Sequence, residues 1–225
     1  NYLEDYYTIS LMDIDALAWQ ATSFDSFDGN SYWCGDSEVG GYLDSWIQFL
    51  DTPSFTVPSG ASLTADLKWS IEDPAGAVVA GTCTDGWDAA NVQISVDNGA
   101  TWDLLNGSDP YDFDCGYGWI WNSPEYDTGG SLNHLAAGWG NSMDWHNISF
   151  NLSAYASQEV IVRFAFGSDP AYCTIDDGSI TGLHVDNIMV ANGLDCTPEN
   201  NCDFTASGAV WVDQFYDYCD DTRPG

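Results

Sequence analysis

The sequence predicts an all-β protein, a two-sheet antiparallel jelly-roll sandwich with long loops. Short runs of alternating apolar and polar residues recur along the chain, with almost no helical periodicity. Of the 35 acidic residues, 29 are Asp and only 6 are Glu, and the chain also has 22 Gly and 15% aromatic residues. Asp and Gly favour turns, whereas aromatic residues favour strands. We therefore expect seven to nine strands, joined by decorated loops, in one domain.

The clearest strand pair in the sequence is a hairpin. Residues 91–96 alternate cleanly, and Asp97-Asn98-Gly99 leads into a second strand at 101–105. Asn-Gly supplies the positive φ angles that such a turn needs. Residues 106–144 then form a long irregular insertion, the kind of loop that often carries function. The other predicted strands lie at residues 46–50, 54–57, 62–71, 145–152, 160–166 and 182–190.

Strand-like sequence also lies outside the predicted sandwich domain, which spans residues 21–192. Residues 1–20 form an N-terminal extension with a strand-like run at 8–17, and residues 193–225 form a Cys-containing extension with a strand at 209–215. Such a strand either pairs with the open sheet edge of a neighbouring copy or folds back on its own domain. Both alternatives stay open from sequence.

The formal net charge is −32, from 3 Lys+Arg against 35 Asp+Glu. This charge repels phosphate backbones and anionic lipid, so we expect no nucleic-acid partner and no binding to anionic membranes. No apolar run approaches the ~18 residues that a membrane helix needs, so membrane insertion is not expected. Three explanations of the charge compete: surface solubility, calcium ligation and adaptation to high salt.

The seven cysteines predict an exported, disulfide-bonded protein, extracellular or at the cell surface, because no C-x-x-C pair suggests a metal or redox motif. Two disulfides are predicted: Cys196 with Cys202 across a short loop, and Cys83 with Cys115 around the hairpin. The odd count leaves one thiol free or paired between chains. The chain opens on Asn1 with no visible signal peptide, which suggests a processed product. Sequons for glycosylation occur at Asn106, Asn147 and Asn151.

A series of short motifs follows in order along residues 21–192. They are FDGNSYW at 27–33, GGYLD at 40–44, LDTP at 50–53, DGWD at 85–88, VQISVDNGATW at 92–102, NLSAY at 151–155, VRF at 162–164, SD at 168–169 and VDNI at 185–188. In order and spacing they resemble the MAM-like jelly-roll domain of immune inhibitor A-type secreted metalloproteases and of many bacterial surface proteins. The resemblance implies a jelly roll that often holds a structural calcium ion.

The protease part of that family is absent. There is no His-Glu-x-x-His motif, and His134, His146 and His184 do not have the spacing of a zinc-binding pair. No Gly-x-Ser-x-Gly motif is present to position a serine nucleophile. We therefore expect a non-catalytic protein.

Two acidic clusters are candidates for calcium, which takes six to eight oxygen ligands. The resemblance implies a site where the first strand meets the last, at Asp25, Asp28 and Asp186. A second cluster is predicted in the loops around the central strands, at Asp85, Asp88, Asp176 and Asp177. The alternative is that these residues form turns, which the Asp-Gly pairs at 28–29, 85–86 and 177–178 would suit.

The insertion contains aromatic residues that suggest a sugar-binding platform: Tyr117, Trp119, Trp121 and Trp139. The alternative is that they pack the insertion onto the sandwich. We thus predict an exported, non-catalytic structural or adhesive subunit that assembles into an extracellular filament through its terminal strands. The alternative is a carbohydrate-binding accessory module of a secreted hydrolase. The expected partners are other copies of the chain or a surface polysaccharide.

Overall fold

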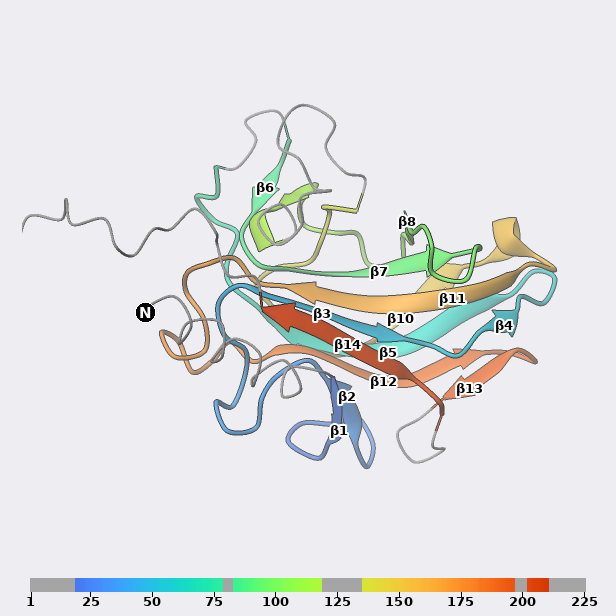
Figure 1. The fold of residues 1–225 in the computed structure, drawn as a ribbon, viewed down its shortest axis with the longest axis horizontal. Helices are drawn as coiled ribbons and strands as arrows, with labels where there is room; N and C mark the ends of the chain where they lie inside the picture. The colour runs from blue at the N-terminus through green and yellow to red at the C-terminus, as the bar shows by residue number, and fades with distance from the viewer. Residues whose placement is uncertain (1–18, 79–82, 119–134, 197–201, 211–225) are drawn as a thin grey trace, which may run out of the picture.

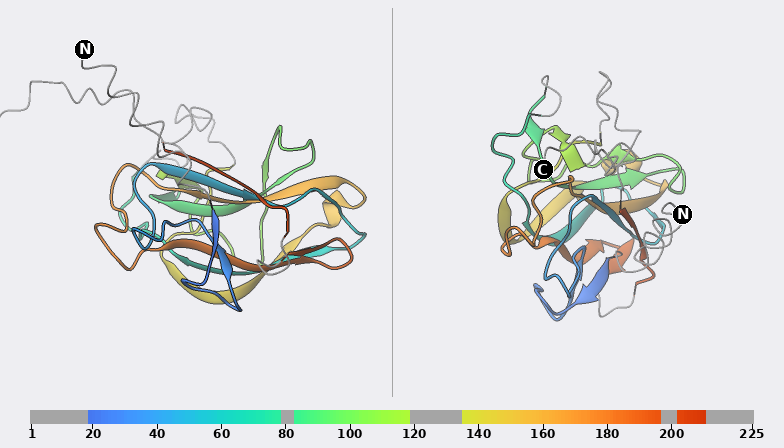
Figure 2. Two further views of the ribbon diagram at one scale, coloured as in Figure 1. Left: turned by 60° about the horizontal axis from the view of Figure 1, so that its bottom comes forward. Right: turned by 60° about the vertical axis from the view of Figure 1, so that its left-hand side comes forward.

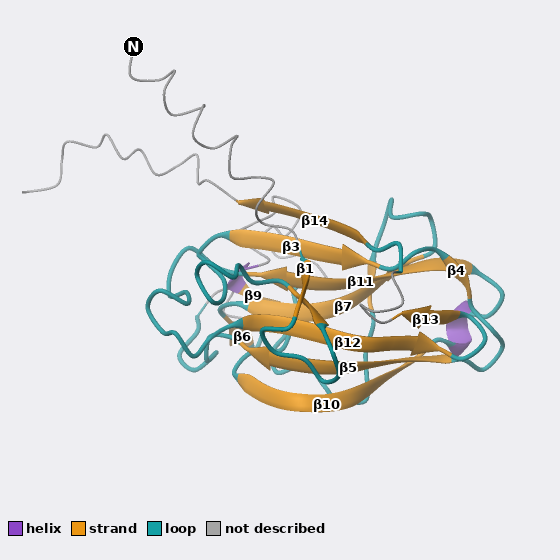
Figure 3. Ribbon diagram, turned by 90° about the horizontal axis from the view of Figure 1, so that it is seen from below, coloured by secondary structure: helices purple, strands orange, loops and turns teal. Residues whose placement is uncertain are grey.

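A computed structural model describes residues 19–78, 83–118, 135–196 and 202–210. Two antiparallel sheets of six strands pack face to face (Figure 1 and Figure 2), so the predicted β-sandwich is confirmed. The long strands of both sheets, such as β3, β11, β12 and β5, run along the long axis of the sandwich (Figure 3). The main strands β3, β5, β7, β10, β11 and β12 belong alternately to the second and the first sheet, which is the crossing pattern of a jelly roll.

The first sheet has the order β1-β2-β12-β5-β10, and β13 pairs with β12. Its strands are β1 (Gln20–Thr22), β2 (Ser31–Trp33), β5 (Ser62–Ser70), β10 (Ser142–Asn151), β12 (Gly182–Val190) and β13 (Leu194–Cys196).

The second sheet has the order β14-β3-β11-β7-β8, and β4 pairs with β11. Its strands are β3 (Trp46–Asp51), β4 (Phe55–Thr56), β7 (Ala89–Ser95), β8 (Asp103–Leu104), β11 (Glu159–Gly167) and β14 (Thr205–Val210). Outside both sheets lie a short parallel pair and one 3-10 turn: β6 (Asp85–Gly86), β9 (Cys115–Gly116) and η2 (Ser153–Tyr155).

Alternation along the strands builds the core. In β5, Leu63, Ala65, Leu67 and Trp69 point between the sheets and are at most 2% exposed. Every second residue of a strand faces the same side, so this period of two buries one face of the strand. Each fully buried Leu contributes about 2 kcal/mol of transfer free energy. Trp139, from the predicted insertion, stacks on Trp69 at 4.8 Å between ring centroids.

The predicted hairpin at residues 91–105 is confirmed. β7 and β8 pair antiparallel, and the turn between them holds Asn98 at φ 59° and Gly99 at φ 85°. Residues 209 and 210 of the predicted strand at 209–215 belong to β14, which begins at Thr205 and pairs with β3, and residues 211–215 lie outside the described residues. The strand-like run at 8–17 lies outside the described residues.

Both predicted disulfides, Cys83–Cys115 and Cys196–Cys202, are present. Cys34 and Cys173 are buried free thiols, and Cys219 lies outside the described residues. The described residues of the 193–225 extension contribute β13 to one sheet and β14 to the other. In the described part of the chain, no helix has the length and apolarity to cross a membrane.

Candidate metal centre

Four acidic side chains lie beside the ends of four strands. Asp44 precedes β3, Glu72 follows β5, Asp88 precedes β7 and Asp169 follows β11. Because β11 is antiparallel to both β3 and β7, the end of β11 lies beside the starts of those two strands, at the left-hand end of the sandwich in Figure 1. Tyr42 links this end to the first sheet, since its hydroxyl accepts a hydrogen bond from Glu72 N at 3.2 Å. We call these four acidic residues the acidic centre.

Three carboxylates of the acidic centre lie close together. Glu72, Asp88 and Asp169 each place a carboxylate oxygen within 4.8 Å of the others. Asp88 is 0% exposed and Asp169 is 5% exposed. One Asp88 oxygen, Oδ1, accepts a hydrogen bond from Asp169 N at 2.7 Å. Asp169 in turn accepts one from Ala171 N at 2.9 Å. Main-chain contacts therefore fix Asp88 and Asp169 in place.

Three buried carboxylate oxygens of the acidic centre accept no hydrogen bond of ordinary geometry: Asp44 Oδ1, Glu72 Oε2 and Asp88 Oδ2. The only side-chain donors of the described chain that reach these groups are the Tyr42 hydroxyl, next to Asp88, and the Cys173 thiol, next to Asp44. A buried polar atom without a partner costs about 1–3 kcal/mol, and more when it is charged. Native proteins leave few buried polar atoms unsatisfied by their own groups, and a bound water or ion can satisfy those that remain. Three such oxygens in one group indicate a binding site for positive charge.

Burial and mutual repulsion raise the pKa of every carboxyl in this group. The pKa of Glu72 rises to about 8, mainly through desolvation and then through the nearby charge of Asp169. Desolvation raises the pKa of Asp169 to about 6. It also raises the pKa of Asp88 well above its usual range, with Asp169 as the next cause. The pKa of Asp44 is raised by desolvation and by Asp176.

The cationic side chains of the described chain are engaged elsewhere. Lys68 Nζ lies 2.7 Å from Asp25 Oδ2. Arg163 forms a bidentate ion pair with Asp51, with Nε donating to Oδ1 at 2.6 Å and Nη2 donating to Oδ2 at 2.8 Å. The third cation of the sequence, Arg223, lies outside the described residues. Within the described chain, only protons or an external cation can therefore neutralise the acidic centre.

The ligand chemistry of the acidic centre suits a hard divalent cation. Carboxylate oxygens are the donors that Ca²⁺ and Mg²⁺ prefer, and Ca²⁺ tolerates irregular sets of six to eight oxygens. Glu72, Asp88 and Asp169 would hold the ion, with Asp44 at their side. Asp176 lies farther out, grouped with Asp44 and the thiol of Cys173. A bound ion would tie together segments that follow or precede strands of both sheets.

The predicted calcium site at Asp25, Asp28 and Asp186 has a different character. Two of the three residues come together, because Asp28 N donates to Asp186 Oδ2 at 3.1 Å. However, Asp25 is paired with Lys68 and also accepts from Trp145 Nε1 at 2.9 Å. The other oxygen of Asp186 accepts from Asn187 N at 2.7 Å. Protein donors thus occupy the carboxylates of Asp25 and Asp186, which would have to face an ion.

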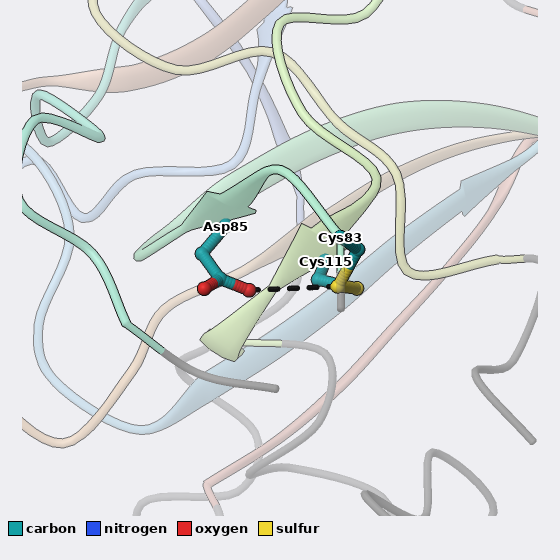
Figure 4. Close-up of a disulfide and its surroundings, with 3 residues drawn as sticks. All are labelled: Cys83, Asp85 and Cys115. Carbon is teal, nitrogen blue, oxygen red and sulfur yellow. Dashed lines mark hydrogen bonds between the residues drawn. A yellow bond between two sulfur atoms is a disulfide. The ribbon is translucent and has the colours of Figure 1, made fainter. Parts of the chain in front are cut away.

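The second predicted cluster is divided among three places. Asp88 belongs to the acidic centre and Asp176 lies next to it. Asp177 accepts hydrogen bonds from Ser179 N and Oγ, as a turn-forming residue does. Asp85 Oδ1 lies 3.5 Å from Cys83 Sγ, the dashed contact in Figure 4. That sulfur belongs to the disulfide with Cys115, so it has no proton to donate and no thiolate to bind a metal.

The aromatic residues of the insertion do not form one surface platform in the described chain. Trp139 is 1% exposed and stacks in the core, which removes it from the predicted set. Tyr117 is half-buried and packs against Trp87 at 6.2 Å between ring centroids. Trp119 and Trp121 lie outside the described residues.

The three sequon asparagines are all exposed, but they differ in what their side chains do. Asn147 Nδ2 donates to Asp66 Oδ1 at 2.9 Å, so a glycan there would break this hydrogen bond. The side-chain oxygen of Asn151 accepts from Ser153 N at 2.9 Å, at the start of η2. Asn106 lies just beyond β8.

The sequence did not single out Asp44, Glu72 and Asp169 as candidate metal ligands. The available signal was their position: each lies two residues beyond a strand boundary, and loops at strand ends meet at the ends of a sandwich. No family model matches the chain, and no curated protein matches it.

Proposed function

We propose that this protein is an exported, non-catalytic structural or adhesive β-sandwich whose fold is held together by a calcium ion at the acidic centre. The observation that carries the proposal is the set of buried carboxylates Glu72, Asp88 and Asp169, whose oxygens lie within 4.8 Å of one another at a place where the described chain supplies no cation. The two disulfides are typical of proteins from oxidising compartments and support an extracellular or cell-surface location. The near-complete burial of Asp88 and Asp169 favours ion binding over catalysis on a bulky substrate.

Thermal unfolding with and without calcium tests this function. A ligand present at 100 times its dissociation constant stabilises the native state by about 2.7 kcal/mol. For a chain of this size we expect calcium to raise the melting temperature by about 5–10 °C over a chelator-treated sample. Magnesium at the same concentration should give a smaller shift, because it demands a stricter octahedral geometry. Equal melting temperatures in calcium and in chelator would contradict the proposal.

The position of β14 favours assembly as part of this function. β14 occupies the outermost position of the second sheet and pairs with β3 over six residues. Thr205, Ala206 and Ser207 are exposed, so main-chain hydrogen bonds rather than side-chain burial hold this part of the strand. An edge strand held in this way is the kind that a neighbouring copy can supply. We propose that copies of the chain exchange β14 to form a filament.

A designed disulfide distinguishes exchange from fold-back. Phe49 and Ser207 face each other in the register of β3 and β14. In an F49C/S207C variant, strand exchange predicts a ladder of covalent oligomers on a non-reducing gel, which collapses to one band under reduction. The single variant S207C is the control. An F49C/S207C product that runs only as a monomer would refute the exchange while leaving the calcium proposal intact.

A further inference from the structure

A second surface of the molecule carries exposed aromatic residues. The loop between β1 and β2 lies over the outer face of the first sheet, where Asp28 N contacts Asp186 of β12. Two rings of this loop are strongly exposed, Phe24 at 54% and Phe27 at 55%. Exposed large apolar side chains gathered in one place often mark an interaction site.

Phe24 rests on a rigid stack. Its ring lies 4.7 Å from the Trp33 ring with 13° between their planes, and Trp33 lies 5.3 Å from the His184 ring with 6° between planes. Trp33 is 0% exposed, and its Nε1 donates to Thr181 O at 2.7 Å. A Cβ at Gly35 would lie 2.2 Å from the Trp33 ring, so glycine is required there for Trp33 to lie flat. One face of Phe24 is therefore fixed from below while its other side meets solvent.

A groove lined by both polar and apolar side chains begins at the edge of Phe24. It has a volume of about 500 Å³, and its walls include Phe24, Asp25, Lys68, Ser142, Met143 and Asp144. Lys68 Nζ lies between two carboxylates, 2.7 Å from Asp25 and 3.4 Å from Asp144. The Ser142 hydroxyl pairs with that of Ser70 at 2.8 Å. Hydroxyl, ammonium and carboxylate groups thus line a groove that starts at an exposed ring.

This combination matches the chemistry of a pyranose ring. The face of an aromatic ring is electronegative and attracts the polarised C–H groups on the flat side of a sugar. The sugar's hydroxyls both donate and accept hydrogen bonds, so they suit a rim that holds carboxylates and an ammonium group. Lys68 is already shared between two carboxylates, which leaves this trio with net charge −1 and disfavours an anionic ligand. We propose that the Phe24 groove binds a neutral saccharide, with one sugar unit stacked on Phe24.

This proposal goes beyond the calcium-held structural function and is independent of it, because the groove shares no residue with the acidic centre. It also differs from the platform predicted in the insertion. If the groove instead docked a protein through general apolar contact, Phe24 and Phe27 would contribute alike, since their exposures are nearly equal. Phe27 contacts Trp145 edge-on at 6.2 Å and is not among the groove walls. Phe27 therefore offers a matched control in the same loop.

The test is a calorimetric titration of the full chain, in calcium-containing buffer, with neutral hexasaccharides built from glucose, mannose, galactose or N-acetylglucosamine. We expect saturable binding of at least one of these probes, about tenfold weaker in F24A because the stacking contact is lost. Binding by F27A should stay within about twofold of wild type, and F24W should retain it. Melting temperatures of all variants check that they fold.

Three results would overturn the proposal. The first is no binding of any of the four probes by the folded wild type. The second is unchanged binding in folded F24A. The third is an equal loss in F24A and F27A, which would indicate a general apolar docking surface. If F24A does not fold, K68M takes its place, with the expected result that probe binding weakens while F27A still binds.

Discussion

Two groups of acidic side chains in the described chain differ in how their charge is neutralised. On the outer face of the first sheet, the pKa of Asp25 is lowered, because hydrogen bonds from Lys68 and Trp145 and the charge of Lys68 outweigh the opposing effect of burial. At the end of the sandwich, the pKa values of Glu72 and Asp169 are raised to about 8 and about 6. The first group is neutralised by the protein itself. The second is left for a cation or for protons.

Acidic residues near one another therefore do not by themselves indicate a metal site. What differs is the supply of positive charge: Asp25 has an ammonium and an indole N–H, whereas Asp88 is buried beside Glu72 and Asp169 with no cationic side chain of the described chain next to it. Carboxylates that already hold strong donors gain little from calcium. Carboxylates that repel one another gain the most.

The largest expected effect is that of removing one charge from the acidic centre. Asn in place of Asp88 keeps an oxygen for Asp169 N but removes a buried negative charge. We expect D88N to melt higher than wild type in chelator, because repulsion falls, and to lose the shift of about 5–10 °C in calcium.

The matched control for D88N is D195N, at an exposed carboxylate of β13. It should keep the calcium shift of wild type. A D88N variant that is still stabilised by calcium as strongly as wild type would place the ion elsewhere.

The pH dependence of stability should distinguish the acidic centre from the group around Asp25. A carboxyl whose pKa is raised on folding binds its proton more tightly in the native state. Its stabilising effect is present below the unfolded pKa of about 4 and is lost as pH rises through the folded pKa. For Asp169 and Glu72 that loss extends to about pH 6 and about pH 8. Above the range in which His184 titrates, from about pH 6.5 to 8, the melting temperature without calcium should therefore fall, and calcium should abolish most of the fall.

At low pH, the dependence of stability on pH is set by proton uptake at His184. Burial lowers the pKa of His184 to about 4, so the native state resists protonation and stability declines as pH drops from about 6.5 to about 4. The measurement is a series of thermal melts from pH 4 to 9, in calcium and in chelator. A chelated protein that grows steadily more stable up to pH 8 would contradict the assignment of the acidic centre.

The smallest expected effect is in the paired group. Replacing Lys68 by Met removes its contacts with Asp25, which is partly exposed to solvent, and with Asp144, which is exposed. Pairs of this kind contribute about 1 kcal/mol or less, so the melting temperature should fall by about 2–4 °C at most. Thermal melts should show the same decrease with and without calcium. A calcium shift larger in K68M than in wild type would mean that the freed Asp25 had become a ligand.

The sequence predicted the layers of this fold better than its site. Alternation in residues 62–71 and the Asn98-Gly99 turn are local signals, and both led to the observed strand and hairpin. The acidic centre joins residues as far apart as Asp44 and Asp169, so it depends on which strand ends meet. Trp139 shows the same limit: the sequence left open whether it was exposed or packed on the sandwich, and the bridge between Ala90 and Trp139 brings it into the core.

The proposed calcium site depends on where a cation binds. Anomalous diffraction from a crystal grown in calcium locates the ion most directly. We predict a calcium peak enclosed by Glu72, Asp88 and Asp169, and none beside Asp25 and Asp186. A peak at Asp186, or fully ordered carboxylates around an acidic centre without an ion at millimolar calcium, would contradict the account.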